Sequence, residues 1–332
     1  MFKKKLGVVA IGNALVDVLS NTTDAFINDQ NKKHGMEKGA MTLIEEARAV
    51  ELYSLMGPGV ESSGGSAANT MAGFASFGGK GGFIGKIADD ELGHVFQHDI
   101  RSAGIEFDTQ PLLFGAPTGR CLVLITPDAQ RTMNTFLGAS VELSPHDIDT
   151  DLIASAKVTY LEGYLFDRKL AKEAFFIGAE AAKNAGNKVS LTLSDPFCVD
   201  RHRYDFNKLV ADHVDILFSN EDELKSLFQC DIDEAKQKVK GLCEVVVLTQ
   251  GAKGLTILTK DEEIQVPAIA IPKVVDTTGA GDSVAAGFFY GYTEGMPLQR
   301  CGQLGTLAAS EIISHVGPRP QTKLAELLKK AA

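Results

Sequence analysis

The sequence predicts an α/β protein: a three-layer α/β/α sandwich around a mostly parallel sheet, with a small β-sheet as a lid. After about residue 155, short apolar, β-rich runs alternate with amphipathic helical segments. This alternation is typical of right-handed βαβ units whose helices cover both faces of a sheet. The 332 residues, 44% apolar and 23% charged, supply about two domains' worth of core at ~150 residues per domain.

The first half begins with a fully buried strand over residues 6–11, a short apolar run that Gly12-Asn13 ends. Residues 20–45 are polar and broken by Asn, Asp and Gly, so we expect short strands and loops there. Residues 119–126 and 131–137 indicate a hairpin around Pro127-Asp128. The other expected elements are helices over 45–56, 66–77 and from Asp89-Asp90 to about 103, and a strand over 82–86.

The second half is regular. Strands over 158–161, 189–193, 216–219 and 245–249 alternate with helices over 170–185, 204–211 and 221–228. Two antiparallel strands, 255–258 and 263–266, precede helices over 281–293, 298–315 and 323–330. We therefore expect a large domain of residues 1–15, 46–111 and 139–332, and a small β lid of residues 16–45 and 112–138.

Composition excludes several classes of function. The net charge of −10, from 33 Lys and Arg against 43 Asp and Glu, argues against a nucleic-acid binder, which carries a basic face. No stretch approaches the ~18 apolar residues of a membrane span. The five cysteines are scattered and form no CxxC pair, so a disulfide scaffold or zinc site is not expected, and we expect a cytoplasmic protein.

The strongest local signal is Asp276-Thr277-Thr278-Gly279-Ala280-Gly281-Asp282, directly before a predicted helix. Small residues at a helix start leave backbone N–H groups exposed at the positive end of the dipole, which suits a phosphoryl group. Asp282 in the first turn would place a carboxylate beside this anion site, where it could take a proton from a hydroxyl. The alternative is a glycine-rich helix start with a capping aspartate. The sequence contains no G-x-x-x-x-G-K-[ST] P-loop anywhere, and no G-x-G-x-x-G motif after a predicted strand.

A second cluster joins Gly64-Gly65-Ser66 to Asn69 at the start of a predicted helix. The two glycines allow a ligand to approach the backbone closely. Asn13 and Asp17 follow the first strand, and ligands of open α/β sheets bind at strand carboxyl ends. An Asp and an Asn together match a vicinal diol. Asn13 as a turn residue and Asn69 as an ordinary polar helix residue are the alternatives.

Four motifs together resemble the ribokinase-like (PfkB) kinases of sugars and nucleosides, over essentially the whole chain. They are Gly64-Gly65-Ser66-Ala67-Ala68-Asn69, Asn220-Glu221-Asp222-Glu223, Thr249-Gln250-Gly251 and Asp276-Thr277-Thr278-Gly279-Ala280-Gly281-Asp282. The last string is highly specific. Two further segments, 12–17 and 118–121, resemble the adenosine kinase branch. The resemblance implies a ribokinase-like sandwich with a β lid and ATP-dependent phosphorylation of a primary hydroxyl, with the 5′-hydroxyl of adenosine or a related nucleoside as the expected acceptor.

The resemblance also implies roles for residues. Asp282 would be the base, and the N–H groups from Gly279 through Ala280 and Gly281 to Asp282 would hold the phosphoryl group. The expected ATP site comprises Asn220, Glu223, Thr249, Gly251 and Thr278, with Glu223 organising Mg²⁺ through water. The expected sugar ligands are Asn13, Asp17, Gly64, Gly65, Ser66 and Asn69, and Arg131 of the lid would neutralise phosphate charge. Cys121, Met133, Leu137 and Tyr164 would form an apolar wall around the base, with plain packing as the alternative. Asp276 and Thr278, with the segment 310–317, are candidate K⁺ ligands through their main-chain carbonyls.

Two other functions remain open from the sequence. A sugar kinase of the ribokinase or fructokinase type would use the same machinery. A non-catalytic nucleotide-binding regulator is disfavoured because Asp282 and Gly279-Ala280-Gly281 are all present. Expected partners are ATP and a small acceptor, without nucleic acid or membrane, and a monomer is favoured over a homodimer.

Overall fold

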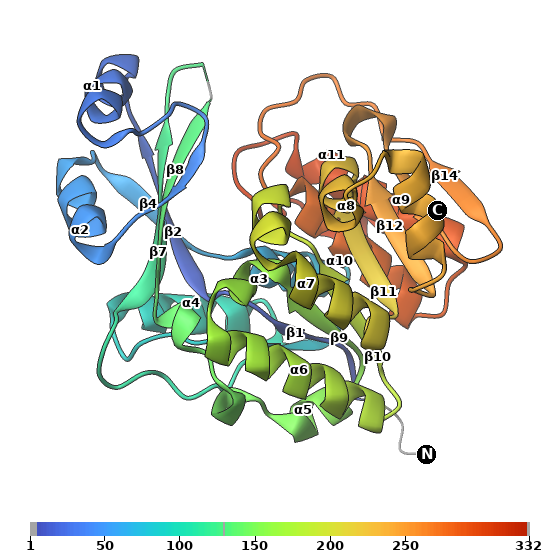
Figure 1. Cartoon of the computed structure of the whole chain (residues 1–332). Helices are drawn as coiled ribbons and strands as arrows, with labels where there is room; N and C mark the ends of the chain where they lie inside the picture. Colours follow the sequence, from blue (N-terminus) through green and yellow to red (C-terminus); the bar gives the residue numbers. More distant parts are fainter. Residues whose placement is uncertain (1–4, 129, 331–332) are drawn as a thin grey trace.

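The architecture is built on two sheets, seen in a computed structural model that describes residues 5–128 and 130–330 (Figure 1). The larger sheet has the strand order β14-β13-β12-β11-β10-β9-β1-β5-β6. All neighbours pair in parallel except β12-β13 and β13-β14, which are antiparallel. The strands are β1 (Leu6–Ile11), β5 (Gly81–Ile84), β6 (Ile105–Glu106), β9 (Ala156–Glu162), β10 (Lys188–Thr192), β11 (Ile216–Asn220), β12 (Val245–Thr249), β13 (Leu255–Leu258) and β14 (Glu263–Val266).

Helices cover both faces of the large sheet because its strands are apolar on both sides. In β1, Val9 and Ile11 enter one buried cluster while Val8 and Ala10 enter the other, as the two-residue repeat of a strand requires. The first face carries α5 (Thr150–Ala154), α6 (Lys169–Asn184), α7 (Pro196–Asp212), α8 (Glu221–Phe228) and α9 (Ile232–Lys240). The second carries α3 (Ser66–Ser76), α4 (Glu91–Ser102), α10 (Ala280–Thr293) and α11 (Leu298–Ile312), with α12 (Leu324–Lys330) beyond. The predicted three-layer fold is confirmed.

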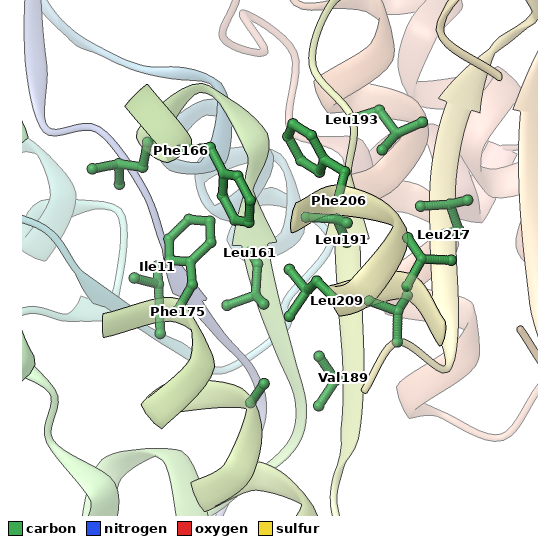
Figure 2. Close-up of a cluster of buried hydrophobic side chains, with 14 of the residues drawn as sticks. Ile11, Leu161, Phe166, Phe175, Val189, Leu191, Leu193, Phe206, Leu209 and Leu217 are labelled. Carbon is green, nitrogen blue, oxygen red and sulfur yellow. The ribbon is translucent and has the colours of Figure 1, made fainter. Parts of the chain in front are cut away.

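Figure 2 shows the cluster on the first face, where aromatic rings from the segment after β9 and from α6 and α7 meet over the sheet. Phe166 and Phe206 stack with ring centroids 4.3 Å apart, and Phe166 also meets Phe175 at 5.7 Å. These contacts fix the 3₁₀ helix Gly163–Asp167, which directly follows β9. The packing therefore holds rigidly the backbone that later contributes to the cavity.

The small sheet has the order β3-β8-β7-β2-β4 and stands beside the large one, with α1 and α2 on its outer side (Figure 1). Its elements are β2 (Leu15–Asn21), α1 (Asp24–His34), β3 (Met41–Leu43), α2 (Glu46–Leu55), β4 (Gly59–Gly64), β7 (Thr118–Ile125) and β8 (Arg131–Gly138). β7 and β8 form the predicted hairpin, with antiparallel pairing. Ile27 of α1 and Leu52 of α2 pack against Val18 and Leu122, so the outer side is a core of its own.

Three expectations about local structure are wrong. Residues 20–45 hold the helix α1, which Thr23 caps; only Ile27 and Gln30 of that helix are buried, so its sequence shows almost no apolar stripe. Residues 59–64 pair with β2 in the small sheet and not with the large domain to which we assign residues 46–111 from the sequence. Helix α7 begins at Pro196, eight residues before the predicted start, because Asp195 caps it.

Helices α5 and α9 lie outside the predicted set, the first because it is a single short turn of five residues. Among residues 5–128 and 130–330, none of the helices combines the length and apolar character that a membrane crossing requires.

Candidate active site

A cavity of about 730 Å³ lies where the carboxyl ends of the central strands face the small sheet. Its floor comes from the ends of β1, β9, β10, β11 and β12 and from the starts of α3 and α10. Its opposite wall comes from β2, β3, β7 and β8. The predicted residues that line it are Asn13, Asp17, Gly65, Ser66, Asn69, Cys121, Met133, Leu137, Tyr164, Asn220, Glu223, Thr249, Thr278, Gly279, Ala280, Gly281 and Asp282.

Four predicted site residues do not line this cavity: Gly64, Arg131, Gly251 and Asp276. Gly64 lies directly behind Asp17, since a Cβ there would meet the Asp17 carboxylate at 2.4–2.6 Å. Gly251 begins a short 3₁₀ turn with a φ of 57°. The other two form a buried ion pair, in which Nη2 of Arg131 lies 2.9 Å from Oδ2 of Asp276.

The anion site at the start of α10 follows from the backbone of Gly279. Its φ of 76° lies in the left-handed region, and a Cβ there would approach the backbone of Pro318 to 2.9 Å, so only glycine fits. No side chain caps the helix. The first hydrogen bond of the helix runs from the Ser283 N–H to the Gly279 carbonyl, and the Ala280 N–H donates to the Thr277 carbonyl at 3.2 Å. The N–H groups of Gly281 and Asp282 therefore have no partner within the helix. Two N–H groups thus face the cavity at the positive end of the helix.

Asp282 is the carboxylate at this anion site. Its Oδ1 accepts a hydrogen bond of 2.6 Å from Ser66 Oγ, and its Oδ2 accepts one of 3.4 Å from Asn69 Nδ2. Burial raises the pKa of Asp282 to about 6, and the charge of Asp17 acts in the same direction against those two bonds. A carboxyl group with this pKa is still ionised at neutral pH and accepts a proton better than an ordinary aspartate.

Asp17 and Asn13 approach the cavity differently. Burial raises the pKa of Asp17 to about 6, although the charges of Arg319 and Arg131 oppose this shift. The Asn13 amide is occupied: its Nδ2 donates to Glu162 Oε1 at 2.6 Å and its Oδ1 accepts from Ser140 Oγ at 2.9 Å. Asn13 therefore lines the cavity, but both polar atoms of its side chain already have hydrogen-bond partners within the protein.

Glu162, at the end of β9, is a buried carboxyl group of the cavity that the sequence analysis missed. It accepts hydrogen bonds from the Asn13 side chain and from the backbone N–H of Ala67, the latter at 2.9 Å. Burial raises its pKa to about 7. It therefore ties the end of β1 to the start of α3, and these two segments carry the predicted sugar ligands.

The predicted ATP site includes the start of α8, where Asn220 and Glu223 form a capping box. Asn220 Oδ1 accepts from the Glu223 N–H at 2.8 Å, and Glu223 accepts from Asn220 N at 3.0 Å and Asn220 Nδ2 at 2.7 Å. Burial raises the pKa of Glu223 to about 7, and the charge of Asp195 also contributes. Asp195 lines the cavity too and caps α7 through the Cys198 N–H at 2.7 Å. Asp195 was not among the residues predicted from the sequence.

Several further lining residues were not found from the sequence. They are Leu15, Met41, Leu43, Thr135, Tyr160, Asp167, Thr192, Ser194, Phe197, Arg201, Phe218, Ser219 and Thr277, besides Glu162 and Asp195. Phe197 is 74% exposed although it faces a cavity. Arg201, the one cation among the described lining residues, bonds to both oxygens of Asp167 at 3.1 and 3.0 Å.

Comparisons with known proteins give the family of this chain. The model of the pfkB family of carbohydrate kinases matches residues 41–324. A probable sugar kinase from Rhizobium etli is 47% identical, with 99% of each chain covered and a TM-score of 0.92. An adenosine kinase from Sinorhizobium meliloti is 46% identical, covering 99% of this chain and 100% of that one, with a TM-score of 0.91.

A third relative is the 5-dehydro-2-deoxygluconokinase of Geobacillus thermodenitrificans, 32% identical over 265 residues, 76% of this chain and 78% of the relative. The family resemblance of the sequence is thereby confirmed. The chain belongs to the pfkB family of carbohydrate kinases and is a sugar or nucleoside kinase of that family.

Proposed function

We propose that this kinase transfers the γ-phosphoryl group of ATP to the 5′-hydroxyl of adenosine or a related nucleoside. The observation that carries the proposal is the apolar wall of the cavity, opposite the anion site. It consists of Leu15, Met41, Leu43, Cys121, Met133 and Leu137 from the small sheet. Met41 and Leu43 are 42% and 49% exposed, so a flat heterocycle placed there would remove apolar surface from water. A free pentose would leave much of that surface wet.

Two aromatic residues strengthen the choice of a nucleoside. Tyr164 and Phe197 line the cavity, and the exposed ring of Phe197 offers a face on which a base can stack. The only cation among the described lining residues, Arg201, is paired with Asp167. An uncharged acceptor fits such a lining better than a sugar acid does. The adenosine kinase from Sinorhizobium meliloti, at 46% identity, supports the same choice.

In the proposed reaction, the acceptor hydroxyl oxygen bonds to the γ-phosphorus while the bond from that phosphorus to the ADP oxygen breaks. The hydroxyl proton passes to Asp282, held in place by Ser66 and Asn69. The N–H groups of Gly281 and Asp282 face the charge on the transferring group. Asp17 and Asn69 would hold the sugar hydroxyls, and the small sheet would exclude water as a lid.

The two candidate metal sites differ in how well they fit. Glu223 and Asp195 both line the nucleotide end, and both Glu223 oxygens already accept bonds from Asn220, which suits contact with Mg²⁺ through water. The ion would neutralise phosphate charge there. The Asp276 side chain is not free to bind K⁺, because its oxygens accept N–H groups of Thr278 and Gly317 at 3.0 Å and lie against Arg131. The K⁺ ligands expected from the sequence are the main-chain carbonyls of Asp276 and Thr278, so K⁺ binding there stays a prediction.

The test is an ATP- and Mg²⁺-dependent phosphorylation screen of adenosine, guanosine, inosine, cytidine, ribose, fructose and 5-dehydro-2-deoxygluconate. We expect turnover of a nucleoside with kcat/KM of at least ~10⁴ M⁻¹s⁻¹. The Asp282→Asn variant, purified in parallel, controls for contaminating kinases. Turnover of free sugars or the sugar acid alone would overturn the nucleoside proposal in favour of a sugar kinase. Rates compared in K⁺ and Na⁺ buffers test K⁺ binding by the main-chain carbonyls of Asp276 and Thr278, and equal rates would contradict it.

A further inference from the structure

The segment Gly317-Pro318-Arg319, between α11 and α12, contacts three parts of the site from behind. Gly317 N donates to Asp276 at 3.0 Å, and Pro318 packs against Gly279 of the anion site. Arg319 Nε donates to Asn69 Oδ1 at 3.4 Å, and Asn69 Nδ2 in turn donates to Asp282 Oδ2. A chain of hydrogen bonds therefore runs from Arg319 through Asn69 to the proposed base.

Arg319 differs from the structural arginines of this fold. Arg101 bonds to the Phe107 carbonyl and to Asp108, and Arg203 bonds to Asp200 and to the Ser226 carbonyl. The Nη2 of Arg319 is buried and has no hydrogen-bond partner among the described residues. The one bond that Arg319 donates goes to the site residue Asn69. Burial without full pairing is costly, and among the described arginines Arg120 and Arg131 also have a buried nitrogen without a hydrogen-bond partner. The bond to Asn69 is what connects Arg319 to the site.

The charges around Arg319 indicate that role. Asp17 and Asp99 are the carboxylates whose charge acts on its guanidinium. Asp99 is already held by the N–H and hydroxyl of Ser63, at 3.2 and 3.1 Å. Asp17, in contrast, accepts no such bond from the described residues and faces the cavity. Arg319 is therefore, with Arg131, one of the two cations whose charge acts on the carboxylate expected to hold the acceptor.

We propose that Arg319 is a positioning residue for the acceptor: it orients Asn69 toward Asp282 and supplies the positive charge that keeps Asp17 ready to accept sugar hydroxyls. The inference rests on the proposed site of a kinase acceptor, but not on whether that acceptor is a nucleoside or a sugar. Arg319 does not line the cavity, so it acts through Asn69 and Asp17 without touching the substrate.

The pH dependence is the readout that separates this role from a structural one. The charged and titratable groups that act on Asp17 or feel its charge are Arg319, Arg131 of β8, Cys121 of β7 and Asp282 of α10. Arg319 and Arg131 both lower the pKa of Asp17 against the effect of burial. Loss of the Arg319 charge should therefore move protonation of Asp17 to higher pH by about one unit.

The experiment compares Arg319→Gln, Arg319→Lys and the control Arg203→Gln, using whichever acceptor the screen identifies. For R319Q we expect KM for the acceptor to rise about tenfold at pH 7, with KM for ATP within about twofold. The acid limb of kcat/KM for the acceptor should move about one pH unit upward. R319K, which keeps the charge, should keep the limb in place while KM rises a few-fold; R203Q should change neither.

An unmoved acid limb in R319Q would overturn the proposal, and so would an equal rise in both KM values. If R319Q does not fold, R319K decides alone: a shifted limb, or an unchanged acceptor KM, contradicts the proposed role. A screen that finds only sugar turnover would remove the nucleoside assignment and leave this test intact, because the same comparison is then made with the sugar.

Discussion

The two walls of the cavity are built in different ways. The wall at the start of α10 is polar and depends on backbone: Gly279 with positive φ, two free N–H groups and the carboxyl group of Asp282. The wall from the small sheet consists mainly of apolar side chains, besides Asp17 and Thr135, on strands from three separate stretches of chain. Backbone geometry tolerates little change, whereas side chains can be exchanged. We therefore expect the first wall to carry the reaction and the second to select the acceptor.

The largest expected effect is on the reacting wall. Asp282→Asn keeps the bond from Ser66 to an oxygen but removes the proton acceptor, so kcat should fall about 10²–10⁴-fold. Nucleotide binding, measured by calorimetry, should change little. Comparable kcat in the D282N variant would show that Asp282 is not the base and would break the assignment of chemistry to this wall.

Gly279 and Gly281, on either side of Ala280, offer the next largest effect and form a matched pair. Gly281→Ala places a methyl group where no protein atom lies within 4 Å, beside the free N–H groups. We expect kcat/KM to fall about 10–100-fold with no loss of thermal stability, because alanine favours the helix. Gly279→Ala requires a φ of 76° and meets Pro318, so it should cost at least about 1–2 kcal/mol of folding free energy. Thermal melts beside kinetics separate the two; similar losses of stability would contradict this account.

The pH profile should report one carboxyl group of each wall, Asp282 of α10 and Asp17 of β2. Because burial raises the pKa of both to about 6, kcat/KM should fall about 30-fold from pH 6 to pH 5 if both must be ionised, and about fivefold if only one must be. The unfolded chain has the ordinary, lower pKa, so the folded state binds these protons more tightly. These two groups therefore favour folding more as pH falls toward 4, and lose that contribution as pH rises through 6. The acid loss should thus be reversible on return to pH 7.5; a profile flat to pH 5 would exclude Asp282 as the titrating base.

Features built from consecutive residues could be predicted from the sequence, whereas contacts between distant segments could not. The anion site occupies seven consecutive residues, 276–282, so its chemistry can be identified without a structure. Glu162 and Arg319 could not be identified, because they meet Asn13 across 149 residues and Asn69 across 250. The strands of the large sheet were predictable from apolar runs. Helix α1 was not, because its surface is polar nearly all round.

The smallest expected effect tests the apolar wall. Met133→Ala removes a flexible side chain that faces the cavity, and Met56→Ala removes the same side chain from the cluster behind the small sheet. If Met133 covers a nucleobase, M133A should raise KM for the nucleoside about 5–10-fold, the loss of about 1 kcal/mol of apolar contact. Its kcat should stay within about twofold, because the phosphoryl group is transferred at the opposite wall. M56A should lower stability without changing KM. Equal KM values for M133A and wild type would mean that the base does not lie against β8, and acceptor choice would then have to be sought at Tyr164 and Phe197 on the other side of the cavity.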